Sequence, residues 1–245
     1  MSPGPAVPSP SGMALWMRTS RLLEEAGFTH AFCHHGRPGD AETCAAVAPG
    51  CTLQRAHQVH GSAVARASGW HEDAPPEADA VISADPSLAC AVRTADCGPV
   101  LVACCATGAA AAVHAGWRGI AGGVVAAAIS ALVRDFGAVP SRMAAAVGPC
   151  ARGRRYEVGE EVASAVSRAG CADALIRHAH APRPFLDVAR ACAMQLAASG
   201  IPWDRIDADP PCSIESTWCP SHRRDPALGA RMLSLVVPRL PRAHG

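Results

Sequence analysis

Three residues of types that bind metals or perform nucleophilic catalysis stand at the ends of apolar runs. They are His60 in QVHGS, Cys97 in TADCGPV and His114 in AAVHAGWRG. A small residue follows each of the three and leaves its side chain accessible. Imidazole nitrogen and thiolate sulfur are ligands that zinc prefers, and three protein ligands leave a fourth position open for water or substrate. The spacing also fits three unrelated polar residues at strand ends.

The segments around two of these residues predict how they come together. Residues 80–112 contain the short apolar runs AVIS, LACAVR, VLVACC and AAAAVH, separated by turn signals, which is typical of strands. VLVACC and AAAAVH flank the short turn ATG, so an antiparallel hairpin brings His114 level with Val100 and Leu101. Cys97 is then expected at the same end of the sheet as His114.

Three further segments favour helices. They are GGVVAAAISALVRDFG (122–137), EVGEEVASAVSRAG (157–170) and DVARACAMQLAASG (187–200). Asp187 is a plausible cap for the start of the last helix, and Gly200 is a plausible stop. Strands and helices mix without strict alternation, so the pattern predicts an α+β fold, or a mixed α/β fold.

The N-terminal segment differs in composition from the rest of the chain. It reads MSPGPAVPSPSG and offers almost nothing to bury, so residues 1–14 are predicted to form a disordered tail. The remaining length lies within the range of one large domain. Residues 15–245 are therefore expected to form a single domain.

The overall composition argues against several functional classes. The chain has 22 basic and 21 acidic residues, so it offers no field of one sign for nucleic acid or a membrane surface. It contains no lysine, which excludes a Walker-type phosphate loop and a Schiff-base lysine. Its 12 cysteines include no CxxC pair, and its apolar stretches are too short to span a bilayer. A reduced, cytoplasmic protein is expected.

Several short motifs in a fixed order point to a known family. They are QVHG (58–61), TADCGPVL (94–101), HAGWRG (114–119), GP (148–149) before YEVG (156–159), and HRRD (222–225) followed by GAR (229–231). Together they resemble the YfiH-like family, also called the laccase-domain or polyphenol oxidoreductase family. The resemblance covers about Phe28 to Leu240. It implies a single catalytic domain of mixed β-sheets flanked by helices, and a zinc and catalytic centre at His60, Cys97 and His114.

The resemblance also implies an activity. Members of the family are described as purine nucleoside phosphorylases that cleave adenosine, inosine, guanosine and methylthioadenosine, and some deaminate adenosine. Zinc, purine nucleosides and phosphate are therefore the expected cofactor and substrates. A copper polyphenol oxidase needs several HxH pairs, and the chain has one, HAH at 178–180. A metal-free cysteine hydrolase or deamidase, with Cys97 as nucleophile and His114 as base, is the other alternative.

Three arginines are candidates for binding phosphate. Arg118 lies in a glycine-rich turn before a helix, where backbone N–H groups favour an anion, but it could instead stack on Trp117. Arg223 and Arg224 suit phosphate because guanidinium forks match its oxygens, with a solvated charge run as the alternative for one of the pair. Asp96 is expected to close its own turn as an Asx cap, with orientation of a ligand as the alternative.

Overall fold

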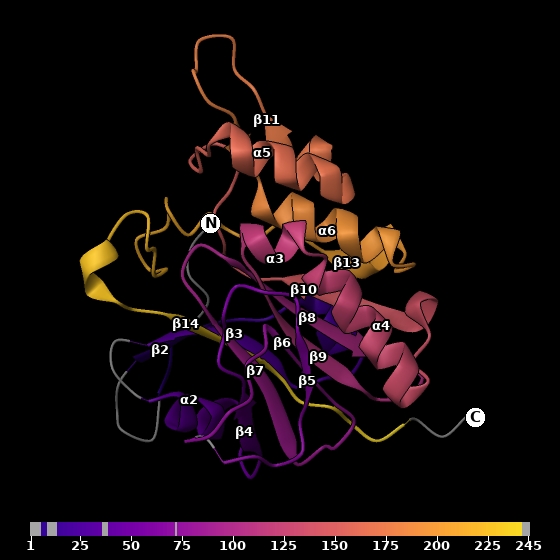
Figure 1. The fold of residues 1–245 in the computed structure, drawn as a ribbon. Helices are drawn as coiled ribbons and strands as arrows, with labels where there is room; N and C mark the ends of the chain where they lie inside the picture. Colours follow the sequence, from indigo (N-terminus) through magenta and orange to yellow (C-terminus); the bar gives the residue numbers. More distant parts are fainter. Residues whose placement is uncertain (1–5, 9–13, 36–38, 72, 242–245) are drawn as a thin grey trace.

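A computed structural model describes residues 6–8, 14–35, 39–71 and 73–241. Two six-stranded sheets form the centre of the molecule, and helices lie on the outer sides (Figure 1). The α-helices are α1 (Arg21–Glu25), α2 (Asp40–Val47), α3 (Trp117–Ala121), α4 (Val124–Phe136), α5 (Glu160–Val166) and α6 (Val188–Ala198). Short helical turns lie at η1 (Pro140–Arg142), η2 (Ser167–Cys171), η3 (Ala172–Ala174), η4 (Trp203–Arg205) and η5 (Pro226–Leu228).

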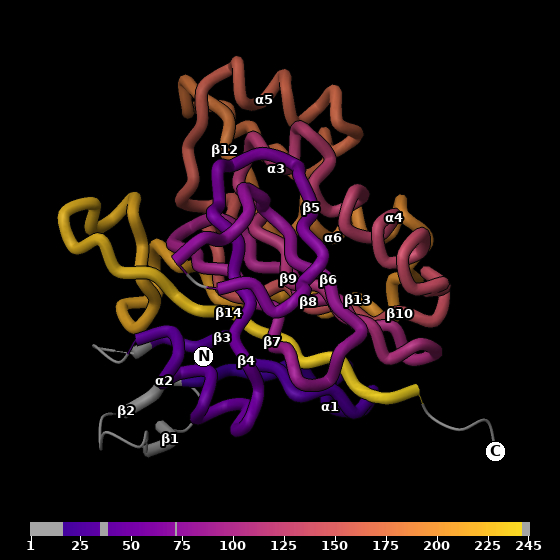
Figure 2. Tube along the Cα trace, turned by 60° about the horizontal axis from the view of Figure 1, so that its bottom comes forward, coloured from indigo at the N-terminus to yellow at the C-terminus, as the bar shows by residue number. Residues whose placement is uncertain are grey.

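The first sheet has the strand order β1-β2-β3-β14-β7-β4. Its strands are β1 (Ala6–Pro8), β2 (Ala14–Arg18), β3 (His30–His35), β14 (Met232–Val236), β7 (Leu88–Thr94) and β4 (Thr52–Arg55). All neighbours are antiparallel except β4 and β7, which run parallel. Figure 2 shows the yellow C-terminal strand β14 running between β3 and β7. The end of the chain thus reaches the middle of the sheet.

The second sheet has the order β13-β10-β8-β9-β6-β5. Its strands are β13 (Ile206–Asp207), β10 (Met143–Val147), β8 (Gly98–Cys104), β9 (Ala110–Ala115), β6 (Ala80–Ser83) and β5 (Val64–Arg66). The centre is antiparallel and both edges are parallel pairs. A separate small ribbon pairs β11 (Leu175–Ile176) with β12 (Phe185–Leu186). The sheets are mixed, so the predicted α+β class is confirmed.

The two sheets pack face to face and are covered on their outer sides. Phe32 and Val92 of the first sheet share a buried cluster with Leu101 of the second. The other face of the second sheet packs against α3, α4 and α6, and α2 covers the other face of the first. Strands β8 and β9 are buried along their whole length. They read as continuous apolar runs because both of their faces are covered.

The predicted helices form, with changes at their ends. Asp187 caps the start of helix α6: its side chain accepts the backbone N–H of Arg190 at 3.0 Å, as the N-cap prediction requires. Helix α4 starts two residues later than the predicted residue 122, after Gly123 in the left-handed region. Helix α5 is shorter than the predicted 157–170 and continues as the π-helical turn η2, which contains Gly170 at φ +77°. A positive φ at that glycine ends regular helical hydrogen bonding.

The hairpin of β8 and β9 confirms the predicted strands but shifts their register by one residue. His114 pairs with Pro99, one position before the predicted Val100. The turn is longer than ATG because Cys105 belongs to it, and the backbone N–H of Gly108 closes the turn on Cys104. Cys97 therefore lies directly beyond the strand that carries the partner of His114.

Most of the predicted N-terminal tail, residues 1–14, falls outside the described residues. Within it, Ala6–Pro8 and Ala14 are described, and both belong to strands of the first sheet. Pairing of an edge strand needs only backbone N–H and C=O groups, which a composition-based prediction does not weigh. Over the described part of the chain, no helix has the length and apolar character needed to cross a membrane.

Candidate active site

The structure brings His60, Cys97 and His114 together. Their potential ligand atoms all lie within 4.8 Å of one another. The two imidazole rings meet edge to face, with centroids 4.7 Å apart. His60 comes from the loop between β4 and β5 and is exposed, whereas His114 on β9 is buried and Cys97 is half-buried. The trio is therefore closed to solvent at His114 and open to solvent at His60.

A buried aspartate that the sequence reasoning missed connects the two histidines. Asp79 Oδ1 lies 2.7 Å from Nδ1 of His114. The same carboxylate accepts three consecutive backbone N–H groups, at 3.3 Å from Val59, 3.0 Å from His60 and 2.6 Å from Gly61. His60 sits at φ +60°, a conformation uncommon for residues other than glycine. The only signal in the sequence is an acidic residue directly before the apolar run AVIS.

The hydrogen bonds of the trio favour charged forms. Burial opposes ionisation of the Cys97 thiol, but hydrogen bonds with His114 and His60 outweigh it and lower the pKa to about 7. Burial likewise opposes protonation of His114, but hydrogen bonds with Asp79 and Cys97 raise its pKa to about 9. At neutral pH the residues alone thus approach a thiolate next to an imidazolium.

The donor set and its surroundings fit a metal ion. Two imidazole nitrogens and one sulfur are zinc-type ligands. Because Asp79 engages Nδ1 of His114, the Nε2 atom remains for ligation, as in many metal sites. A Cβ atom at Gly116 would lie 3.0 Å from Cys97 Sγ and 3.2 Å from Cδ2 of His60, so the glycine leaves room for the trio. Among the His, Cys, Asp and Glu side chains of the described residues, these three form the group whose ligand atoms lie close enough together to hold a metal ion.

The trio opens into a cavity of about 520 Å³. Five arginines line it: Arg55, Arg93, Arg118, Arg223 and Arg231. Among the described residues that line it, the one acidic side chain is Asp96. The cavity is therefore strongly cationic although the whole chain is nearly neutral, which suits an anionic ligand.

Two of the predicted phosphate residues reach this cavity over aromatic rings. The Arg118 guanidinium lies 4.3 Å from the ring centroid of Trp117, and that of Arg223 lies 4.9 Å from the ring of Tyr156. The stacking predicted as the alternative for Arg118 thus coexists with a position on the cavity wall. An aromatic platform fixes the planar guanidinium and leaves its edge free for a ligand.

Comparison of the sequence with known proteins identifies a family and several relatives. The family model described as "Multi-copper polyphenol oxidoreductase laccase" matches residues 38–239. The chain belongs to this family. A purine nucleoside phosphorylase of Streptomyces griseus is 45% identical over 175 residues, which cover 71% of this chain and 69% of the relative. The purine nucleoside phosphorylase YfiH of Shigella flexneri is 35% identical over 180 residues, or 73% of this chain and 71% of the relative.

Solved structures of two other bacterial proteins share the fold. The Bacillus licheniformis hypothetical protein YfiH superposes with a TM-score of 0.79, covering 95% of this chain and 97% of its own, at 22% identity. YlmD of Geobacillus stearothermophilus gives a TM-score of 0.72 at 21% identity, covering 93% and 92%. The YfiH-like resemblance and the fold that it implied are therefore confirmed.

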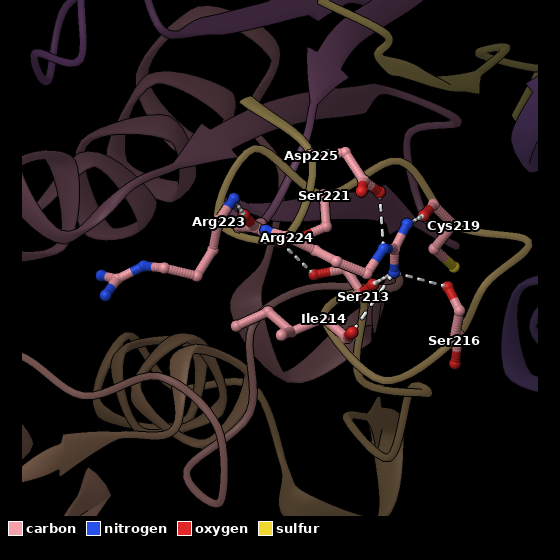
Figure 3. Close-up of polar contacts among 9 residues, drawn as sticks. Ser213, Ile214, Ser216, Cys219, Ser221, Arg223, Arg224 and Asp225 are labelled. Atoms are coloured by element: carbon pink, nitrogen blue, oxygen red, sulfur yellow. Dashed lines mark hydrogen bonds and ion pairs between the residues drawn. The ribbon is translucent and has the colours of Figure 1, made fainter. Parts of the chain in front are cut away.

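The two adjacent arginines of the HRRD motif, Arg223 and Arg224, have different surroundings. Their guanidinium groups point away from each other (Figure 3). Arg223 lines the cavity and Arg224 does not. Each nitrogen of the Arg224 guanidinium has an acceptor in the protein (Figure 3). These acceptors are Asp225 and the backbone carbonyls of Ser213, Ile214, Ser216 and Cys219. The prediction of Arg224 as a phosphate ligand is corrected, because its hydrogen bonds hold the 213–219 loop.

The Asx cap expected for Asp96 in the family's TADC motif is also corrected. Asp96 is buried at φ +80°, and its carboxylate accepts the hydroxyl of Ser213 at 2.6 Å and the backbone N–H of Arg223 at 2.7 Å. These partners lie more than 100 residues away in the sequence, so local turn chemistry could not reveal them. Asp96 thereby joins the turn that carries Cys97 to the segment that carries Arg223.

The one HxH pair of the chain lies elsewhere. His178 and His180 are exposed in the loop between β11 and β12, and His178 packs edge-on against Phe185 at 5.5 Å. Neither belongs to the residues that line the cavity. The histidine pair thus lies beside the small β11–β12 ribbon and not at the trio.

Proposed function

We propose that the chain is a zinc-dependent purine nucleoside phosphorylase that acts on adenosine, inosine, guanosine and methylthioadenosine. The observation that carries the proposal is that a His, Cys, His trio and two stacked arginines open into one cavity. The names of the Streptomyces and Shigella relatives support the reaction. In phosphorolysis, phosphate attacks ribose C1′ while the purine leaves.

In this proposal the arginines bind and orient the phosphate. Arg118 and Arg223 offer planar donor groups that match phosphate oxygens and that Trp117 and Tyr156 hold in place. A phosphate held in position converts a bimolecular attack into an effectively intramolecular one. Asp96 accepts the backbone N–H of Arg223 and directly precedes Cys97, so it fixes the position of Arg223 relative to Cys97.

His60, Cys97 and His114 would hold the zinc ion, which supplies a Lewis acid that stabilises negative charge in the cavity. Asp79 keeps the proton on Nδ1 of His114 and therefore directs Nε2 toward the zinc position. Two imidazole nitrogens and one thiolate are ligands that zinc prefers, which supports zinc in this proposal. A zinc ion held by three protein ligands would keep one position for water, which also supports adenosine deamination as a side activity.

A specific observation favours a second candidate, a metal-free cysteine hydrolase. The ring of His114 lies between the Asp79 carboxylate and the Cys97 thiol, with hydrogen bonds to both. This order of acid, base and nucleophile is the arrangement that activates a thiol. The pKa of Cys97 near 7 supplies thiolate at neutral pH. Cys97 would then attack a carbonyl or amidine carbon, with His114 as the acid for the leaving group.

Product analysis tests the proposed reaction directly. Zinc-loaded protein is incubated with adenosine, with and without inorganic phosphate, and the products are separated by liquid chromatography. Adenine and ribose 1-phosphate that form only with phosphate support phosphorolysis, whereas inosine in both samples reports deamination. Absence of adenine under both conditions contradicts the proposal.

Metal analysis tests the proposed ligands separately. Purified protein should contain close to one zinc ion per chain, and His60→Ala should lose most of it while staying folded, because two ligands bind zinc weakly. His178→Ala is the matched control, since His178 is an exposed histidine outside the cavity. Full zinc retention in His60→Ala would remove His60 from the centre.

A further inference from the structure

A group of three arginines on the cavity wall lies apart from the elements that carry Arg118 and Arg223. Arg55 ends β4, Arg93 is the second-last residue of β7, and Arg231 directly precedes β14. These strands are neighbours in the first sheet, in the order β14-β7-β4. Strands β4 and β7 run parallel and β14 runs antiparallel to β7, so the three arginines occupy the same end of the sheet.

The same three arginines also share one face of the sheet. Side chains alternate between faces along a strand. Leu53, Ala91 and Leu233 pack in the buried cluster under α2, and each lies two residues from one of the arginines. Consistent with this face, Asp40 at the start of α2 lies 3.1 Å from Nε of Arg55 and 3.5 Å from Nε of Arg93.

The cluster of Arg55, Arg93 and Arg231 carries more positive than negative charge. Asp40 is the carboxylate paired with two of them, and its side chain is 17% exposed. In the described part of the chain, Arg231 has no ion pair and donates to the carbonyl of its neighbour Ala230. Like charges gathered on adjacent strand ends repel one another, and an anion between them would offset that cost.

The side chains around the cluster leave it open to a ligand. Arg93 is 42% and Arg55 33% exposed, and all three arginines line the cavity of the trio. Asp96, the acidic side chain that lines the cavity, is occupied by Ser213 and the backbone of Arg223. Inorganic phosphate and a neutral nucleoside would use Arg118 and Arg223, which leaves Asp40 as the one carboxylate paired with the three arginines of the cluster in the described part of the chain.

We propose that Arg55, Arg93 and Arg231 form a second anion subsite in this cavity, and that it takes the phosphate of a purine nucleoside 5′-monophosphate. The inference rests on the proposed function and extends its substrate class from nucleosides to nucleotides. With AMP, an oxygen of inorganic phosphate forms a bond to C1′ and the bond from C1′ to the purine breaks. The products are adenine and ribose 1,5-bisphosphate, and the proton released by the attacking hydrogen phosphate ends on the purine nitrogen.

Calorimetric titration of the zinc-loaded full chain tests the subsite. Adenosine, AMP and inorganic phosphate are titrated separately. We expect AMP to bind about tenfold or more tightly than adenosine, and more tightly than phosphate, because one molecule joins the purine to a charge-assisted contact. Arg93→Gln and Arg231→Gln should reduce AMP affinity to that of adenosine and leave adenosine affinity unchanged. Arg142→Gln is the matched control, since Arg142 is exposed and lies outside the cavity.

Three results would overturn the subsite. The first is equal affinity for AMP and adenosine. The second is AMP binding no tighter than phosphate, which indicates a free-anion site. The third is an AMP preference that survives both Arg93→Gln and Arg231→Gln. Phosphorolysis of adenosine is measured in parallel on the same preparation. Adenine formation without an AMP preference removes the subsite alone, whereas an AMP preference without adenine formation removes the proposed reaction alone.

Discussion

Asp79 holds the imidazole of His114 at 2.7 Å and at the same time accepts the backbone N–H groups of the loop that carries His60. One buried carboxylate thus sets both the ring orientation of one proposed ligand and the backbone of another. Burial opposes its ionisation, but the bonds from His114 and Gly61 lower its pKa below the ordinary value. The assembly of the trio therefore depends on a residue outside it.

Asp79→Asn should weaken zinc binding about 10- to 100-fold, the usual effect of losing a residue that supports a metal ligand. The amide has one acceptor oxygen for the four donors that now share the carboxylate, and its NH₂ group faces donors. Affinity is measured by competition with a chromogenic chelator, and folding by circular dichroism. The control is Asp204→Asn at an exposed acid. Unchanged zinc affinity in a folded Asp79→Asn protein would show that Asp79 does not position the ligands.

The state of Cys97 distinguishes the two candidate functions. As a zinc ligand it should resist alkylation in the holo-protein and become reactive after chelation. As a free nucleophile next to His114 it should react fastest in untreated protein, with loss of activity in step. Mass spectrometry of the peptide that contains Cys97 measures this, with buried Cys192 as an internal reference. Rapid alkylation of Cys97 in zinc-loaded protein would favour the cysteine hydrolase.

Arg118→Ala should raise the Michaelis constant for phosphate about tenfold or more, because a charge-assisted contact is worth about 1.5–3 kcal/mol. The Michaelis constant for adenosine should change little, since Arg118 is proposed to contact phosphate. Steady-state kinetics with each substrate varied in turn separates the two effects, and Arg142→Ala at an exposed site is the control. An unchanged phosphate dependence would assign Arg118 to stacking on Trp117 alone.

Arg224→Gln should destabilise the fold and leave the phosphate site chemistry intact. The substitution removes donors from carbonyls of the 213–219 loop, and leaving one such acceptor unpaired costs about 1–3 kcal/mol. Urea denaturation measures the loss. The matched comparison is Arg154→Gln, an exposed arginine on a neighbouring turn, which should change stability little. Equal stability of the two variants would contradict the role given to Arg224.

Stability should fall below about pH 6.5 in part because of His30. Burial lowers the pKa of His30, with partial opposition from its hydrogen bond to Phe28. The neutral ring donates from Nδ1 to the Phe28 carbonyl at 2.9 Å and accepts the Ser20 N–H at Nε2, 2.8 Å away. The folded state then binds fewer protons than the unfolded state below the unfolded pKa. The His30 contribution is complete above that pKa and is lost as the pH falls through the folded one.

The test for His30 compares pH profiles. Urea midpoints of the wild type and His30→Gln are measured from pH 8 to pH 5. The variant should be less stable at high pH but should lose less stability on acidification, whereas His71→Gln at an exposed site should follow the wild type. Parallel profiles for the wild type and His30→Gln would exclude His30 as the titrating group.

Local patterns in the sequence were sufficient for the strands 80–83 and 88–94, the hairpin that brings Cys97 to His114, and helices α4 and α6. Hydrophobic period, turn residues and caps are short-range signals, and each of these elements depends on neighbours within a few residues. The place of His60 beside the hairpin came from the family resemblance, because a loop position carries no pattern that fixes its partner. The family and the fold class therefore follow from the sequence alone.

The tertiary structure alone decided which polar groups act together. Asp79 and Asp96 look alike in sequence, as acids beside apolar strands, yet one holds the histidines and the other ties Cys97's turn to the C-terminal loop. Adjacent Arg223 and Arg224 face opposite ways because Asp96 binds the backbone of one and loop carbonyls bind the side chain of the other. Likewise, the cluster of Arg55, Arg93 and Arg231 exists because β14 enters the sheet beside β7. Strand order follows from packing of whole faces, a long-range balance that no local stretch of residues encodes.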